Sequence, residues 1–423
     1  MISSKRATAA AVAGLAAVSL VAGCSTKAQD SSGGGGGADG VKTDFGVTDD
    51  EILLGVQSDL SGVFKSIGLA LTHGNELWVD DINAEGGVCG RKIKLDIQDN
   101  AYKADNAVPL YEQQKSEILG YLQLIGSPVL AALKQKLTAD KVLAIPAAQA
   151  SQNMDSPSVL LIGATYDVEM INGLSWMMDE GTLAEGDKIG HIYVDSEYGQ
   201  NGLMGSKYFA EENGMTVIEA PVAATDTDMT AIVAKFKDEG VKAIALTTTP
   251  AATASVAVQN TTQNLNVPMM GSNPSYTPNL LSDSAVVAAL ENMYVSSGTM
   301  PFGGPSPLAE KIKTEYDKRF SADQPNYAVN SGYSEGIVWA EVLKKACDNG
   351  DLTREGILKA RTEVTAVSTE GMNGEQDLSD PGAPATRESF ITKPDPNVPG
   401  GLSIVSDLAA SEAAKSYKAP HQK

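Results

Sequence analysis

Apolar runs of strand length alternate with segments of helical periodicity from residue 51 onward. The first four runs predict strands over 51–58, 91–99, 121–127 and 141–149. Between the first two, the segment 68–84 places Leu71, Trp78 and Ile82 on one helical face and stops at two glycines. Strands that alternate with helices over short connections predict a parallel sheet with helices on both faces.

The same alternation continues in a second block. Its apolar runs predict strands over 188–195, 215–222, 241–248 and 267–271. Helices are predicted over 228–239, 306–320 and 331–348, whereas the Gly- and Pro-rich chain beyond 365 has no clear period. Because 423 residues exceed what one core usually serves, the predicted fold class is α/β with two doubly wound parallel-sheet lobes.

Small and polar residues follow several predicted strands, at the edge where ligands of such sheets bind. This rule selects Ser127, 147–149, 195–198, 247–249 and 272–273. Ser127 stands at the start of an Ala- and Leu-rich helix, where free backbone N–H groups attract an anionic or carbonyl oxygen. The alternative is that its hydroxyl only caps that helix.

The first residues have the features of an export signal. Lys5 and Arg6 precede an apolar run over 7–22, which is shorter than the roughly 20 residues of a membrane-spanning helix. Small residues then lead directly into Cys24, as in the bacterial lipobox. We therefore expect a signal peptide over 1–23 and a lipid on Cys24, which would tether the exported protein to the outer face of the cell membrane. The alternative is a soluble secreted protein with an incidental cysteine.

The residues after Cys24 predict a flexible linker over 24–47, because 25–43 is polar and contains five consecutive glycines. The formal net charge of −21 argues against nucleic acid as a partner and against electrostatic adhesion to anionic lipid.

Histidine and cysteine are scarce, with three of each and no CxxC pair, so we expect no metal site and no cofactor. With Cys24 assigned to the anchor, Cys89 and Cys347 remain as a pair in an oxidising compartment, which favours a disulfide. Two buried free thiols are the alternative.

Short motifs follow one another in a fixed order along the chain. They are GVQSDLSG at 55–62, VDDINAEGGVCG at 79–90, IGSP at 125–128, DSEYGQNG at 195–202 and MMGSN at 269–273. Together they resemble the branched-chain amino acid (Leu/Ile/Val) binding proteins of ABC importers, which have the type I periplasmic-binding-protein fold. The resemblance covers about 50–410.

This resemblance implies two lobes that close like a hinge on a small solute and are joined by three crossovers. It implies lobe I over 48–165 and 296–364 and lobe II over 166–295 and 365–410, which leaves 411–423 as a polar tail. The family's ligand-binding positions would be Ser127, Ala147, Ala148 and Gln149 from lobe I, and Tyr198, Thr248 and Asn273 from lobe II. It also implies a monomer that is not an enzyme and that delivers its solute to permease and ATPase subunits.

The chain departs from the family at one end of this site. Members that bind amino acids commonly place an acidic residue in the loop that holds Asn273, so a ligand ammonium would lack a charged partner here. Ile67 and Gln149 also replace the family's hydroxyl groups. We therefore expect a small polar solute with an anionic or carbonyl oxygen, such as an amino acid, an amide or a carboxylic acid, that need not carry an amine.

Rival functions have weaker support in the sequence. A GxSxG motif at 332–336 would suggest a hydrolase, but no apolar strand precedes it and His421 is the only later histidine, so we predict a helix there. Asp226 and Asp228 lack the Gly and distal Glu of a calcium loop and more plausibly cap a helix. A ligand-sensing receptor module of the same fold is the remaining alternative, although no spanning helix follows residue 410.

Overall fold

The structure is a computed structural model that describes residues 35–36 and 40–423. The expected signal peptide over 1–23, Cys24 and most of the linker lie outside the described residues. None of the helices in the described part combines the length and the apolar character needed to cross a bilayer.

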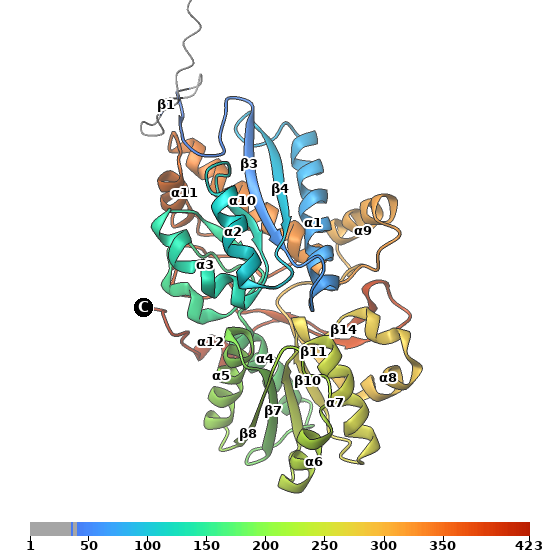
Figure 1. Cartoon of the computed structure of the whole chain (residues 1–423). Helices are drawn as coiled ribbons and strands as arrows, with labels where there is room; N and C mark the ends of the chain where they lie inside the picture. The colour runs from blue at the N-terminus through green and yellow to red at the C-terminus, as the bar shows by residue number, and fades with distance from the viewer. Residues whose placement is uncertain (1–34, 37–39) are drawn as a thin grey trace, which may run out of the picture. The chain divides into compact units, whose positions relative to one another are not determined.

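The first sheet has four parallel strands in the order β4-β3-β5-β6. They are β3 (Glu51–Ser58), β4 (Lys92–Asp99), β5 (Tyr121–Leu124) and β6 (Ala144–Pro146). Alternate residues of β3 serve opposite faces: Ile52 and Leu54 join one buried cluster, and Leu53 packs on another. The first cluster includes α1 (Lys65–Ala84) and α10 (Ala328–Asp348), and the second includes α2 (Ala104–Gln114) and α3 (Ser127–Ala139) (Figure 1).

The second sheet has seven strands in the order β14-β13-β11-β10-β9-β7-β8. Five are parallel, namely β7 (Lys188–Val194), β8 (Thr216–Val222), β9 (Ala243–Thr247), β10 (Met269–Ser272) and β11 (Met293–Ser297). Two pair antiparallel, namely β13 (Ser389–Pro394) and β14 (Leu402–Ala409). One face is covered by α4 (Tyr166–Asp179) and α5 (Glu197–Glu212), and the other by α6 (Thr230–Glu239) and α7 (Pro250–Thr262).

The chain passes between the two sheets three times, over 147–165, 298–306 and 362–388. The prediction of two doubly wound sheets joined by three crossovers is therefore confirmed. The smaller elements are α8 (Ser284–Ala289), α9 (Pro307–Arg319), α11 (Arg354–Arg361), α12 (Glu412–Ser416), β1 (Gly35–Gly36), β2 (Lys42–Thr43) and β12 (Asp351–Leu352).

The structure differs from the sequence analysis near both ends of the described chain. Within the segment expected as a linker, β2 pairs with β12. The segment expected as a polar tail contains α12, and the Tyr417 hydroxyl donates to Asp167 at 2.9 Å. Val367 and Met372, from the part expected in lobe II, are buried in the same cluster as Ile52 of the first sheet. These segments carry too short a run of apolar residues to reveal their burial.

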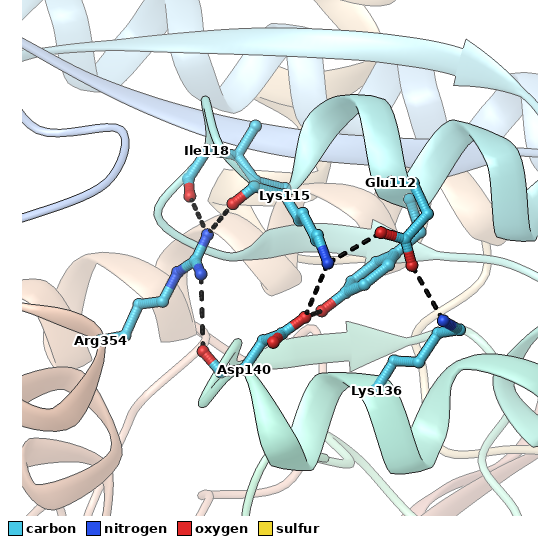
Figure 2. Close-up of polar contacts among 7 residues, drawn as sticks. Glu112, Lys115, Ile118, Lys136, Asp140 and Arg354 are labelled. Atoms are coloured by element: carbon cyan, nitrogen blue, oxygen red, sulfur yellow. Dashed lines mark hydrogen bonds and ion pairs between the residues drawn. The ribbon is translucent and has the colours of Figure 1, made fainter. Parts of the chain in front are cut away.

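Arg354, at the start of α11, ties that helix to the first sheet (Figure 2). Its guanidinium donates to the carbonyls of Lys115, Ile118 (2.8 Å), Leu119 (3.2 Å) and Asp140 (3.5 Å). The side chain is buried, and its guanidinium carbon lies 4.4 Å from the centre of the Phe45 ring. Figure 2 also shows Lys115 between Glu112 and Asp140. The Arg354 guanidinium therefore provides hydrogen-bond donors to four backbone carbonyls in loops of the first sheet.

A disulfide joins Cys89, between α1 and β4, to Cys347, near the end of α10, with the Cα atoms 6.4 Å apart. The bond closes a loop across 258 positions and pairs the two cysteines for which the sequence favoured a disulfide.

Replacing both cysteines with Ser should lower the free energy of unfolding by about 2–5 kcal/mol, because the unfolded chain regains the conformational freedom of that loop. Urea denaturation measures the loss, and wild-type protein with reductant serves as the control. Two reactive thiols in unfolded, non-reduced protein would contradict the bond.

Glu335 of α10 is a buried acid between α10 and α1, where Asn75 donates to it at 3.0 Å. Burial raises the pKa of Glu335 from 4.5 to about 8, so the folded protein holds a proton there that the unfolded chain releases above pH 4.5. The contribution of this proton to the free energy of unfolding is fully present below pH 4.5 and is lost as the pH rises through 8.

Glu335→Gln should therefore gain stability over wild type as the pH rises, by up to about 1.4 kcal/mol per pH unit. Denaturation at pH 5 and pH 8 tests this, and an equal difference at both values contradicts it.

Candidate functional site

A cavity lies where strands of both sheets end. It contains about 660 Å³ of space free of protein atoms, part of which is open solvent. Its lining includes Ser127 after β5, Ala148 after β6, Tyr198 after β7, Asn273 after β10 and Gly298 after β11. The carboxyl ends of parallel strands therefore define this site, as the sequence analysis expected.

Most of the residues proposed from the sequence meet at this cavity. The lining contains Ser127, Ala147, Ala148, Gln149, Tyr198 and Asn273. Thr248 is not part of the lining: its hydroxyl lies 2.8 Å from that of Thr253, and its carbonyl accepts the Tyr198 hydroxyl at 3.1 Å. Thr248 therefore positions Tyr198 and does not face the cavity.

Ser127 lines the cavity from the first turn of α3. Gly126 precedes it with φ of 114°, and a side chain there would meet Val129 and Tyr102. Among the described residues, no hydrogen bond joins the Ser127 hydroxyl to the backbone of α3, which favours a ligand-facing role over a cap. Burial raises the pKa of Tyr102 to about 12, although hydrogen bonds with Ser127 oppose the shift. Around Ser127 the cavity therefore offers neutral hydroxyl and N–H donors.

Asn273 and Glu169, which are hydrogen-bonded to each other, also line the cavity. The Asn273 side chain donates to Glu169 Oε1 at 2.8 Å, and the Gly298 N–H donates to the same oxygen at 2.8 Å. Burial raises the pKa of Glu169 to about 8, against the lowering effect of these donors. The Tyr327 hydroxyl, at the start of α10, donates to Asn273 Oδ1 at 3.2 Å and so links the elements of one sheet to those of the other.

The remaining walls are largely apolar and aromatic. Apolar side chains from the first sheet and its connections are Phe64, Ile67, Leu71, Ile125 and Ile162. The Tyr166 hydroxyl donates to the Ala147 carbonyl at 3.0 Å, and the Tyr198 hydroxyl lies 2.9 Å from Ser272 Oγ. Gln149 donates to the Pro146 carbonyl at 2.8 Å, and its oxygen has no hydrogen-bond partner within the described chain. No Lys, Arg or His occurs among the described residues of the lining.

Sequence reasoning missed the acid and most of the tyrosines. Tyr102, Tyr166 and Tyr327 lie outside the strand ends that the rule selects. Glu169 carried one local signal: it stands among Val168, Met170 and Ile171, which is an unusual place for a charged residue.

The rival sites find no support. Residues 332–336 lie inside α10, where Ser334 donates to the Asn330 carbonyl at 2.9 Å, so the GxSxG motif forms no nucleophile turn. Asp228 accepts the Thr230 N–H at 3.0 Å at the start of α6, as a helix-capping residue does. Over residues 35–36 and 40–423, no cluster of His, Cys, Asp and Glu could hold a metal ion.

Two doubly wound sheets with three crossovers and a cavity at their carboxyl ends are the arrangement of a bilobal solute-binding protein. The family model described as "Periplasmic binding protein" matches residues 51–398, and the chain belongs to this family. Its place of action is therefore extracytoplasmic.

Solved structures agree with this assignment. The fatty acid ABC transporter substrate-binding protein from Thermomonospora curvata is 37% identical, with a TM-score of 0.87 over 91% of this chain and 99% of that one. A branched chain amino acid ABC transporter protein from Thermus thermophilus with bound valine is 16% identical, with a TM-score of 0.73 over 86% of this chain and 98% of that one, which shows the fold alone.

A curated relative agrees as well. Leu/Ile/Val-binding protein homolog 8 from Brucella abortus (strain 2308) is 24% identical over 314 residues, which is 68% of each chain.

Proposed function

We propose that this chain is the substrate-binding lipoprotein of an ABC importer and that it captures a small carboxylic acid with an apolar body. The observation that carries the proposal is the cavity, which combines oxygen-binding donors at Ser127 with apolar walls and no cationic side chain in its described lining. Similar proteins named for ABC transport support the importer role, and among them a relative of 37% identity is named for fatty acids.

The ligand's oxygen would lie at the start of α3. A carboxylate there meets the Ser127 hydroxyl and the first turn of α3, whose N–H groups carry a partial positive charge. The apolar body would then contact Phe64, Ile67 and Leu71, and each buried CH₂ group would contribute about 0.8 kcal/mol. The acyl chain of a carboxylic acid matches this division into one polar end and an apolar wall.

The lipid anchor and the partners complete the proposal. The VAGC sequence that ends at Cys24 after an apolar run supports lipidation, which would hold the protein near its permease. The protein would act as a monomer and pass its solute to permease and ATPase subunits.

Removing the Ser127 hydroxyl tests the oxygen site. Ser127→Ala should weaken the binding of a carboxylic acid by about 1–3 kcal/mol, because a buried oxygen loses a donor. Titration calorimetry with octanoate as the probe measures the change. Ser334→Ala is the matched control, because its hydroxyl is also buried but lies outside the cavity lining, so its affinity should equal that of the wild type. Equal affinity of Ser127→Ala and wild type would contradict the proposed oxygen site.

Replacing Cys24 with Ser tests the anchor. The variant lacks the thiol that would carry the lipid, so it should move from the membrane fraction to the soluble exported fraction. Cell fractionation followed by immunoblotting measures the distribution, with the wild-type chain as the control. Retention of Cys24→Ser in the membrane fraction would exclude anchoring through this residue.

A further inference from the structure

Glu169 is a carboxyl group inside a cavity that has no cationic side chain in its described lining. It lies in the first turn of α4 and is fully buried. An ionised carboxylate in such a place is costly unless a charge of opposite sign is close. The proposed ligand brings a negative charge of its own, which makes ionisation of Glu169 still less favourable.

The hydrogen bonds of Glu169 distinguish its two oxygens. Oε1 accepts two donors at 2.8 Å, one from the Asn273 side chain and one from the Gly298 N–H. Within the described part of the chain, Oε2 accepts only the Asn273 backbone N–H, at 3.4 Å. Oε1 therefore has the bonding of a carbonyl oxygen, and Oε2 is the place for a proton.

The groups that face Glu169 also favour the neutral form. Asp167 on the same helix adds negative charge, and burial raises the pKa of Glu169 to about 8. Tyr166, Tyr198 and Tyr327 are the other titratable groups around it, and burial raises the pKa of each of them as well. Every titratable side chain that faces Glu169 is thus an acid or a phenol.

We propose that Glu169 determines specificity by donating the proton on Oε2 to one oxygen of the carboxylate that Ser127 also binds, so that the site selects carboxylic acids over the corresponding α-amino acids. This inference rests on the proposed function and names the substrate class more narrowly. An ammonium group would instead require Glu169 to ionise, and Asn273 offers no charge in its place.

The two ligand classes predict opposite responses to pH. A carboxylate that needs the protonated acid binds with full affinity at pH values below 8. Above the pKa of Glu169, its affinity falls about tenfold per pH unit. An α-amino acid that needs the ionised acid gains affinity as the pH rises toward 8.

The test compares 4-methylpentanoate with leucine, which differs from it by the amino group. Calorimetry from pH 6 to pH 9 should show that 4-methylpentanoate binds the wild-type protein more tightly than leucine does and weakens above pH 8. Glu169→Gln should lose this pH dependence and bind 4-methylpentanoate with the same affinity at pH 6 and pH 9, because its amide donates at both pH values and has no proton to lose. Glu335→Gln is the matched control, because it removes a buried acid of similarly raised pKa outside the cavity lining and should keep the wild-type pH profile.

Two results of this comparison would overturn the inference. One is leucine binding that strengthens toward pH 8 and disappears in Glu169→Gln. The other is 4-methylpentanoate binding to wild type that does not change between pH 6 and pH 9.

A ligand-free measurement separates this inference from the proposed function. If 4-methylpentanoate and octanoate both fail to bind at pH 6, the proposed function is overturned. Glu169 is then tested by stability alone: the difference in unfolding free energy between Glu169→Gln and wild type should grow from pH 5 to pH 8. A constant difference would show that Glu169 is not protonated in the folded protein and would overturn the inference.

Discussion

The site depends on one constraint, the direction of the parallel strands. In each sheet the parallel strands end at a single edge, and both of these edges border the cavity. The side chains of a strand alternate between two helix-covered faces, whereas the residues just past its end remain available for a ligand. Ser127, Ala148 and Asn273 occupy such positions.

The electrostatics of the cavity follow from its walls. The described lining combines aromatic rings and aliphatic side chains with hydroxyl groups, and its acid lies among neutral donors. In such surroundings a charge is expensive and a hydrogen bond is strong, so recognition depends on which protons are present. The Tyr327–Asn273 hydrogen bond places this chemistry where elements of the two sheets meet.

The sequence predicts the fold well where apolar periodicity is strong. All the strands expected between 51 and 271 are present, because buried parallel strands leave unmistakable apolar runs. The antiparallel β13 and β14 were missed, since β14 has only one buried residue and follows a stretch rich in Gly and Pro. The site residues also fall into a predicted and a missed group. Residues at strand ends, such as Ser127, were predicted from the topology. Glu169 and Tyr166 were missed because they enter the cavity from a crossover helix, whose path no local pattern reveals.

The order of the elements along the chain has a consequence for biogenesis. Helix α10, which packs against α1 and is bonded through Cys347 to Cys89, comes after nearly all strands of the second sheet. The second sheet in turn receives β13 and β14 from the last part of the chain. Neither half can be completed in the order of synthesis, and the Tyr417 hydroxyl reaches Asp167 beside the cavity only when the C-terminal residues are present. Each half therefore has all of its elements only after much of the other half has been synthesised.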